Sequence, residues 1–318
     1  MGLPTLEFPS VAVVIPTKNR PGDLNATLRS LLNGTVLPNQ LIIIDQSSND
    51  DSEKVVEWSF VEAPKEIRAI VELSYVHNAS LSGLTAARNT SLALVKSDIL
   101  LFLDDDVILE KEFIQEITLA HRRYPDAVGV GGIITNYSPP TRLLRWWESL
   151  FVRGPFHDDR QPIYRRAETL AKSSPLPVTR LGGGLMSFRM GAIGGRRFDE
   201  NLTGPCVGED VDFCARLAPK ALLLIIPSAR LVHKRSSAAR SEGSHLSRHA
   251  LAMWYLYHKN WSHGIKNRIS FLLLNLGYCI AAVVIAVRRS SLEPFEDLVA
   301  AVKEARRLII HGSDTRRC

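Results

Sequence analysis

Short apolar stretches alternate with helix-like stretches through the first 120 or so residues of the chain. The apolar stretches are four or five residues long and rich in β-branched side chains, which is typical of buried strands. Between them, leucines recur at helical spacing, as Leu24, Leu28 and Leu31 do after Pro21. We expect strands at residues 11–15, 41–44, 73–76 and 99–103, and helices from Pro21 to Gly34, from Gly83 to Val95 and from Phe113 onward.

Strands that are apolar throughout and alternate with helices indicate an α/β fold, with a mainly parallel sheet covered by helices on both faces. Ligands of such folds bind at the carboxyl ends of the strands. Asp45 ends the second predicted strand, and Asp104, Asp105 and Asp106 follow the fourth. The sequence therefore places carboxylates where an α/β fold has its binding site.

The pattern loosens after Gly129, and residues 142–180 are expected to form a long irregular excursion, of the kind that often serves as a binding loop. A glycine-rich strand at 181–188 and a short helix at 208–217 follow. Two closing strands are expected at 222–226 and 229–233.

The C-terminal part has a different character. Residues 269–287 carry no charge and are just long enough to cross a bilayer, while basic residues flank them on both sides. A spanning helix, a buried helix and an interfacial segment all fit this pattern. Residues 292–311 have apolar positions at helical spacing and a basic opposite side, which fits an interfacial amphipathic helix. We expect a catalytic domain over 1–235 and a helical, membrane-associated region over 236–318.

Composition narrows the classes of function. The chain has 318 residues, 45% hydrophobic and 23% charged, which excludes collagen-like, low-complexity and wholly disordered proteins. The net charge of +6 suits an anionic small molecule or an anionic membrane surface as well as nucleic acid. Basic residues are not interleaved with aromatic ones as in a nucleic-acid groove, so nucleic acid is not an expected partner. Neither a GxGxxG fingerprint, a P-loop nor a GxSxG elbow occurs.

The acidic run offers the sharpest chemistry. Asp104 and Asp106, one residue apart at a strand end, can bind a hard divalent cation and leave sites for phosphate oxygens, although a solvated acidic turn has the same sequence. Asp45 can accept hydrogen bonds from a base or ribose, or belong to an ordinary turn. His233 is either a third metal ligand or a strand-end histidine.

Two further segments have both a functional and a plain interpretation. Glu209 and Asp210 open a helix, where the dipole favours acids, but a carboxylate there can also act as a general base. Gly183 and Gly184 lie in a glycine run that allows either close approach of an acceptor or a tight bend.

Taken in order, five stretches resemble the inverting glycosyltransferases of family 2. These enzymes have the GT-A fold, which is a Rossmann-like fold of nucleotide-diphospho-sugar transferases. The five stretches are VAVVIPTKNRPGDLNATLRSLL, IIIDQSSND, SGLTAARNTSLALVKSDILLFLDDDV, GGGLMSFRMGAIGGRRFDENL and GEDVDFCARL, between residues 11 and 217. No QxxRW motif follows Asp210, which favours a single-addition enzyme over a processive synthase.

The resemblance implies a role for each matching residue. Asp104 and Asp106 would form the DxD element, with Asp106 the direct ligand of Mg²⁺ or Mn²⁺ and His233 completing the metal site. Asp210 would be the catalytic base, and Glu209 would shape the acceptor pocket together with Gly183 and Gly184. The nucleotide-sugar site would be formed by Pro16, Thr17, Asp45, Arg88, Asp104 and Asp105.

The resemblance also implies the reaction. A sugar would pass from a nucleotide-diphosphate sugar to a hydroxyl of a glycan or lipid-linked saccharide, by metal-assisted single displacement on the cytoplasmic side of the cell membrane. Two alternatives stay open: a phosphoryl-transfer or phosphatase enzyme that uses Asp104 and Asp106, and a non-catalytic nucleotide-sugar-binding protein.

Overall fold

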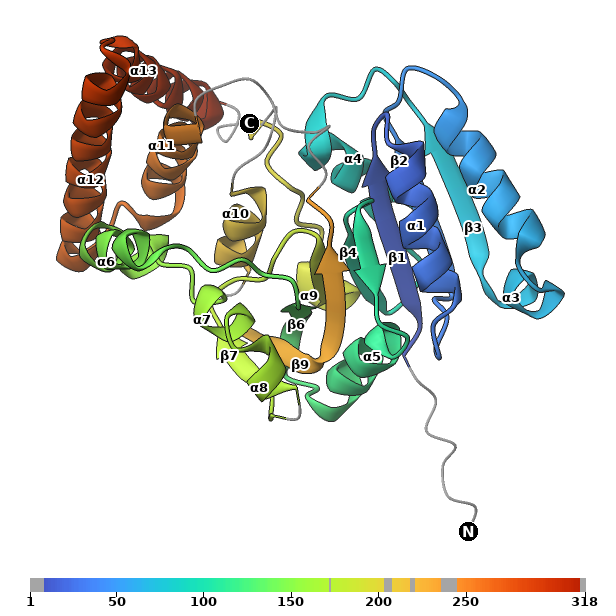
Figure 1. Ribbon diagram of the computed structural model, residues 1–318. Helices are drawn as coiled ribbons and strands as arrows, with labels where there is room; N and C mark the ends of the chain where they lie inside the picture. The colour runs from blue at the N-terminus through green and yellow to red at the C-terminus, as the bar shows by residue number, and fades with distance from the viewer. Residues whose placement is uncertain (1–8, 172, 203–207, 218–220, 236–244, 315–318) are drawn as a thin grey trace.

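The computed structural model describes residues 9–171, 173–202, 208–217, 221–235 and 245–314. Strands and helices alternate along the first half of the chain (Figure 1). The strands are β1 (Val11–Thr17), β2 (Gln40–Asp45), β3 (Glu72–His77), β4 (Ile99–Leu103), β5 (Val107–Leu109), β6 (Ala127–Ile134), β7 (Leu176–Val178), β8 (Leu185–Arg189) and β9 (Leu222–His233). The helices up to that point are α1 (Pro21–Leu32), α2 (Asp51–Glu62), α3 (Lys65–Ile70), α4 (Gly83–Leu92), α5 (Phe113–Arg123), α6 (Arg142–Phe151), η1 (Gly154–Phe156), α7 (Gln161–Tyr164), α8 (Ala167–Leu170), α9 (Met190–Ile193) and α10 (Glu209–Arg216).

The described strands form one sheet in the order β3-β2-β1-β4-β8-β6-β9-β5, with β7 paired to β9. The block β3-β2-β1-β4 is parallel, β6 and β9 are parallel to each other, and β8 runs antiparallel between β4 and β6. The predicted α/β fold with a mainly parallel sheet is confirmed.

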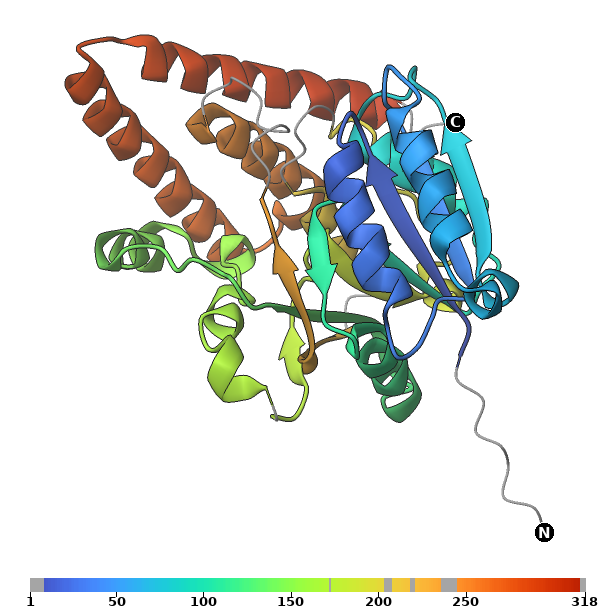
Figure 2. The same cartoon turned by 45° about the vertical axis from the view of Figure 1, so that its right-hand side comes forward.

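The chain changes direction across the sheet between β1 and β4. It first builds β1, β2 and β3 outward in one direction, and α1 and α2 pack side by side on one face (Figures 1 and 2). It then returns through α4 to β4 on the other side of β1. Because crossovers between parallel strands are right-handed, the reversal carries α4 to the opposite face and leaves a crevice at the carboxyl ends of β1 and β4.

Two expectations about the second half are wrong. Residues 222–233 form one continuous strand, β9, rather than two, even though Pro227 lacks a backbone N–H. The β6–β9 pairing shifts register between Gly131 and Ile133, and a proline is tolerated where the ladder is irregular. The stretch 142–180 is also not irregular throughout, because it contains α6, η1, α7, α8 and β7; Thr141 caps α6 by accepting a hydrogen bond from the amide of Leu144.

The C-terminal helices are α11 (His245–Leu256), η3 (a π-helix, Tyr257–Trp261), α12 (Ile265–Arg289) and α13 (Glu293–Asp314). They form an apolar cluster of their own, which also includes Phe156, Leu202 and Val211. This cluster is tied to α10 by polar contacts: Asp212 accepts a hydrogen bond from Asn260 at 3.0 Å and pairs with Lys259 at 2.8 Å. The boundary at 235/236 stays a prediction, and residues 236–244 beside it lie outside the described residues.

By length and composition, α12 could cross a membrane, with a mean hydropathy of 2.3 over its most apolar window. The helix has two apolar sides. One is buried from Ser270 to Ala286 and packs against α6, η1 and α13. The other carries an exposed apolar row: Ile265, Ile269, Leu272, Leu276, Val283, Val284 and Val287.

Candidate active site

The carboxyl ends of β1, β2 and β4 meet at one edge of the sheet, as the sequence predicts. Thr17 lies opposite Asp45 in the β1–β2 register, beside Pro16. The Thr17 hydroxyl donates a hydrogen bond of 2.7 Å to Asp105, in the loop after β4. Asp45 is fully buried and accepts hydrogen bonds from the amide of Ser47 at 2.8 Å and the hydroxyl of Tyr75 at 2.6 Å.

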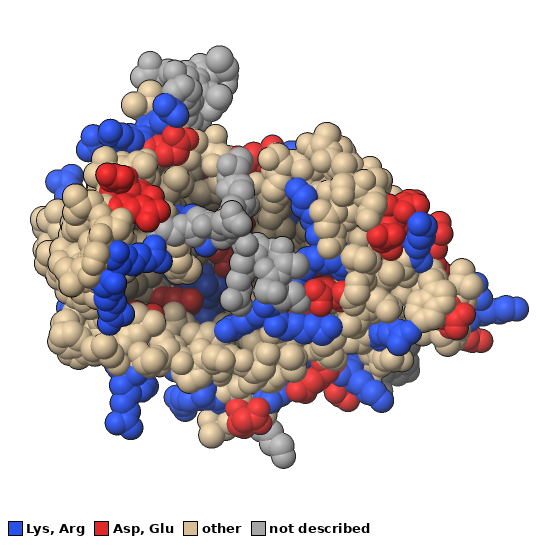
Figure 3. Space-filling view, turned by 45° about the horizontal axis from the view of Figure 1, so that its top comes forward, with Lys and Arg blue, Asp and Glu red and all other residues tan. Residues whose placement is uncertain are grey.

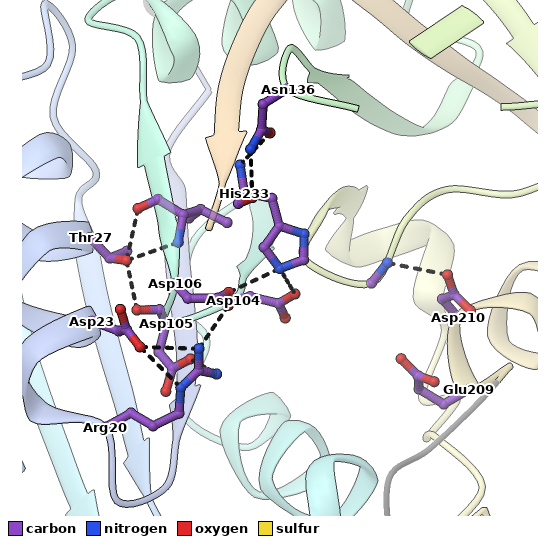
Figure 4. Close-up of polar contacts among 12 residues, drawn as sticks. Arg20, Asp23, Thr27, Asp104, Asp105, Asp106, Asn136, Glu209, Asp210 and His233 are labelled. Atoms are coloured by element: carbon purple, nitrogen blue, oxygen red, sulfur yellow. Dashed lines mark hydrogen bonds and ion pairs between the residues drawn. The ribbon is translucent and has the colours of Figure 1, made fainter. Parts of the chain in front are cut away.

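Asp104, Asp106 and His233 form a compact cluster in which their ligand atoms all lie within 4.8 Å of one another (Figure 4). His233 Nε2 is 3.0 Å from Asp106 Oδ1 and 3.7 Å from Asp104 Oδ2. Pairing of β5 with the end of β9 brings His233 to the loop Asp104–Asp106 between β4 and β5, which we call the acidic loop. Burial opposes protonation of His233, but the hydrogen bond to Asp106 and the charge of Asp104 outweigh it and raise the pKa of the imidazole.

Two carboxylates and one imidazole fit a divalent cation such as Mg²⁺ or Mn²⁺. The backbone around the cluster leaves space for Asp104 in particular. A Cβ added at Gly184 would lie 2.2 Å from Asp104 Oδ2, so a side chain at this position would displace the carboxylate. The donor set and the missing Cβ together support a metal site here.

Arg20 holds the other side of the acidic loop and was not predicted. Its guanidinium pairs with Asp105 and with Asp106, each at 2.7 Å (Figure 4). The polar run that follows β1 could have indicated it, since that run ends at the same edge of the sheet. Asp105 contacts Thr17 and Arg20, and its assignment to the nucleotide-sugar site stays a prediction.

Arg88 links the acidic loop to α10. Its side chain is 1% exposed, lies over the ring of Phe102, and pairs with Glu209 at 3.0 Å. It also donates to the carbonyl of Gly183 at 2.9 Å and lies 3.9 Å from Asp104. Burial, and then the neighbouring charge of Asp210, raise the pKa of Glu209, and Arg88 opposes this rise.

Asp210 lies in the first turn of α10. Gly208 precedes the helix with a φ of +93°, a conformation that favours glycine. The Oδ2 atom of Asp210 accepts hydrogen bonds from Arg160 at 2.9 Å and from the amide of Gly183 at 3.2 Å. Its Oδ1 accepts one from the amide of Val211 at 2.8 Å. The carboxylate is thus held in one orientation.

Arg160 is the second residue that the sequence did not reveal. It pairs with both Asp158 and Asp210 and donates to the carbonyl of Leu181. It lies between η1 and α7, in the stretch expected to be irregular, where no motif marks it.

A cavity of about 490 Å³ brings the parts together. Asp104, His233, Arg88, Glu209 and Asp210 all line it, as do Gly183 and Gly184. The space-filling view shows a hollow in which acidic and basic side chains gather (Figure 3). Pro16, Thr17, Asp45, Asp105 and Asp106 do not line this cavity, and they lie at the neighbouring strand ends.

Comparison with known families gives one match that spans more than half of the chain. The model of glycosyl transferase family 2 matches residues 12–189. The chain belongs to glycosyl transferase family 2. The predicted classification as a family 2 glycosyltransferase is therefore confirmed.

Curated relatives of this family 2 member are distant. It is 28% identical to the pre-mycofactocin glycosyltransferase of Mycobacterium tuberculosis over 231 residues, which cover 72% of this chain and 44% of that protein. It is 29% identical to the validoxylamine A glucosyltransferase of Streptomyces hygroscopicus over 138 residues, 42% of this chain and 29% of that protein. The matches span less than half the length of these two relatives.

Solved structures share the fold at low sequence identity. TarS of S. aureus in complex with UDP-GlcNAc has a TM-score of 0.62 at 14% identity, covering 93% of this chain and 80% of that one. The mannosyltransferase PcManGT of Pyrobaculum calidifontis, in complex with GDP-Man and Mn²⁺, has a TM-score of 0.54 at 16% identity, covering 95% and 87%. These similarities confirm the GT-A-like fold.

Proposed function

We propose that this chain transfers a sugar from a nucleotide-diphosphate sugar to an acceptor hydroxyl, with inversion at the anomeric carbon. One observation carries the proposal: the same cavity is lined by Asp104 and His233 on one side and by Asp210 on the other. A carboxylate base and a cluster suited to a cation thus face one space. TarS binds UDP-GlcNAc and PcManGT binds GDP-Man with Mn²⁺ in the similar structures, which supports the same donor class here.

Asp210 is the proposed base. The contacts from Arg160 and the Gly183 amide fix its carboxylate toward the cavity. The acceptor oxygen attacks the anomeric carbon from the face opposite the nucleotide and gives its proton to Asp210. The bond from that carbon to the diphosphate oxygen breaks, and the nucleoside diphosphate leaves with the electron pair. A single displacement of this kind inverts the stereochemistry.

The remaining predicted residues take positioning roles. Asp104, Asp106 and His233 would hold Mg²⁺ or Mn²⁺, which supplies positive charge against the leaving diphosphate. Asp45, Pro16 and Thr17 are the proposed nucleoside side of the site, since they lie at the neighbouring strand ends. Arg88 braces Glu209 against the glycine run, which keeps the acceptor side of the cavity open.

Nucleoside diphosphate release tests the proposal. Purified protein is incubated with Mn²⁺ and a panel of UDP, GDP and dTDP sugars, with mixed glycan and lipid-linked acceptors. We expect release with at least one donor, and a loss of about 10²–10⁴-fold in Asp210→Asn, with nucleotide binding retained. Asp126→Asn, on an exposed loop, is the matched control. Normal turnover in Asp210→Asn would remove Asp210 as the base, and nucleotide binding without any release would favour the non-catalytic alternative.

Family membership leaves the phosphoryl-transfer alternative without support.

We also infer that the exposed apolar row of α12 lies against the cytoplasmic face of the membrane. The buried side of α12 extends nearly the length of the helix, so a helix packed in this way fits a position along the bilayer surface. Neighbouring α6 exposes apolar side chains as well: Leu143 is 73% exposed and Trp146 is 59% exposed. Such a position would bring the chain close to lipid-linked acceptors.

Sedimentation with anionic vesicles tests this placement. The wild-type chain should sediment with the vesicles, and Leu272→Glu, in the middle of the row, should weaken binding. Val61→Glu, at an exposed apolar position on α2, is the control. Wild-type chain that stays in the supernatant with vesicles present, or Leu272→Glu that sediments as well as the wild type, would contradict the inference.

A further inference from the structure

A second, larger cavity of about 690 Å³ lies between α6, η1, α11 and α12. Its wall is largely apolar, formed on one side by Leu144, Trp147 and Phe151 of α6 and on the other by Leu274 and Tyr278 of α12. Its size lies within the usual range for cavities that hold small ligands.

The two cavities meet at the proposed base. Asp158, Arg160, Gln161 and Asp210 line both of them. A molecule in the apolar cavity would therefore have one end beside Asp210, on the acceptor side of the active site. The cavity also extends between α6 and α12, and α12 carries the exposed apolar row.

One buried charged side chain in this cavity, Arg180, has no charged partner within 4.0 Å in the described part of the chain. Arg180 is 6% exposed, and its guanidinium donates to the backbone carbonyl of Pro155 at 2.6 Å. Its buried Nε has no hydrogen-bond partner, and among the described residues no carboxylate oxygen lies within 4.0 Å of its guanidinium. Burial of a cation without a counter-ion is costly, so an anion at this position would be favoured.

The charges around Arg180 do not supply that anion. Asp158 and Asp210 are already paired with Arg160, whose own positive charge lies near Arg180. Asp159 accepts a hydrogen bond from the amide of Thr179 and does not pair with the Arg180 guanidinium within 4.0 Å. Burial, and then Arg160, lower the pKa of Arg180, while Asp158, Asp159 and Asp210 oppose this from a distance. His249, on α11, lines the same cavity, and burial lowers its pKa to about 4, so it is neutral near pH 7. Arg180 is the cation beside which a ligand anion would gain most.

We propose that this cavity binds a lipid-linked acceptor, with its phosphate group at Arg180, its apolar chain between α6 and α12, and its hydroxyl-bearing head group toward Asp210. The inference rests on the proposed function, because the cavity is called the acceptor side on account of Asp210. Two features favour a lipid phosphate over a free anion. The cavity wall is largely apolar, and α12, which forms part of that wall, carries the exposed apolar row on its other side. Leu144 lines the cavity and is 46% exposed, so the wall reaches the surface at α6.

Binding of three probes to the full chain in non-ionic detergent tests the proposal. Farnesyl phosphate carries both the anion and the chain, farnesol only the chain, and inorganic phosphate only the anion. We expect farnesyl phosphate to bind at least about tenfold more tightly than farnesol, as for hydrogen bonds to a charged group, and inorganic phosphate to bind weakly. An excess of UDP or GDP with Mn²⁺ should leave farnesyl phosphate bound, since the nucleotide has its own site.

Arg180→Gln should abolish the preference for farnesyl phosphate over farnesol, and Arg180→Lys should restore part of it. Arg68→Gln, on exposed α3, should leave the preference unchanged. If Arg180→Gln does not fold, as judged by thermal melting, Arg180→Lys and the three wild-type probes still decide. Equal affinity of the wild type for farnesyl phosphate and farnesol, or an unchanged preference in Arg180→Gln, would overturn the proposal. Tight binding of inorganic phosphate alone would overturn it in favour of a free-anion site.

The readout separates this inference from the proposed function. If Asp210→Asn binds the lipid and the wild type releases no nucleoside diphosphate with any donor, the proposed function is contradicted and the lipid site is supported. Release with a soluble glycan acceptor, and no preference among the three probes, would do the reverse.

Discussion

Gly184 gives a direct test of the proposed metal site, because one methyl group changes the position of one ligand. The chain at Gly184 runs beside Asp104, whose amide donates to the Gly184 carbonyl at 3.3 Å. In Gly184→Ala, the new Cβ would lie 2.2 Å from Asp104 Oδ2 and 2.5 Å from its Cγ. Contacts this short are not tolerated, so the carboxylate must move.

The size of the movement sets the expected effect. To reach even a close contact, Asp104 Oδ2 must retreat by about 1 Å from its position against Gly184. Metal–ligand distances hold to within about 0.2 Å, so a shift of this size breaks the bond or distorts the site. Disturbing the support of one ligand usually costs about 10–100-fold in metal affinity, or about 1.4–2.8 kcal/mol.

Titration of Mn²⁺, followed by electron paramagnetic resonance, measures this loss in the absence of any substrate. Gly191→Ala is the matched control, since Gly191 is exposed in α9 and nothing lies within 4 Å of its added Cβ. Thermal melting shows whether Gly184→Ala still folds. Wild-type Mn²⁺ affinity in a folded Gly184→Ala protein would refute the assignment of Asp104 as a metal ligand.

Three further predictions concern stability, measured by chemical denaturation. Burial, and then the charge of Arg189, lower the pKa of His121 to about 3, whereas an unfolded histidine titrates at about 6.5. The unfolding free energy should therefore fall by about 1.4 kcal/mol per pH unit below about pH 6.5. His121→Gln should lose this part of the slope, and a slope equal to that of the wild type would contradict the prediction. Thr27→Val should cost about 1–3 kcal/mol by leaving the buried amide of Val107, the first residue of β5, unpaired. Thr27→Ser should stay close to the wild type, and equal stability of the two variants would count against the hydroxyl. Lys259→Met should cost about 3 kcal/mol by removing the cation between Asp199 and Asp212, and a loss below about 1 kcal/mol would show that this pair contributes little.

The sequence predicts the parallel half of the fold well because its strands are buried on both faces. Residues 99–103 form β4 as predicted, and β1, β2 and β3 extend one or two residues beyond the predicted ends. The acidic loop and His233 meet as expected, since strand ends share an edge. These features depend on local apolar runs and on one topological rule.

What the sequence does not reveal depends on contacts between distant residues. Arg88 and Glu209 are 121 positions apart, and no spacing rule predicts their ion pair. Arg160 reaches Asp210 only because α7 folds back beside the glycine run. The break predicted within 222–233 follows the usual rule for proline, and it fails because Pro227 falls where the β6–β9 ladder is already irregular.

The link between Lys259 and Asp212 has a consequence for the acceptors that this protein can use. It fixes α10, and with it Asp210, to the helices that carry the exposed apolar row. If that row rests on the bilayer, the reacting carboxylate stands at a constant height above the lipid. The protein would then select acceptors by the distance of their hydroxyl from the membrane. Hydroxyls at the height of Asp210 would react, and those on longer or shorter head groups would not. Acceptor choice would be set by reach as well as by recognition.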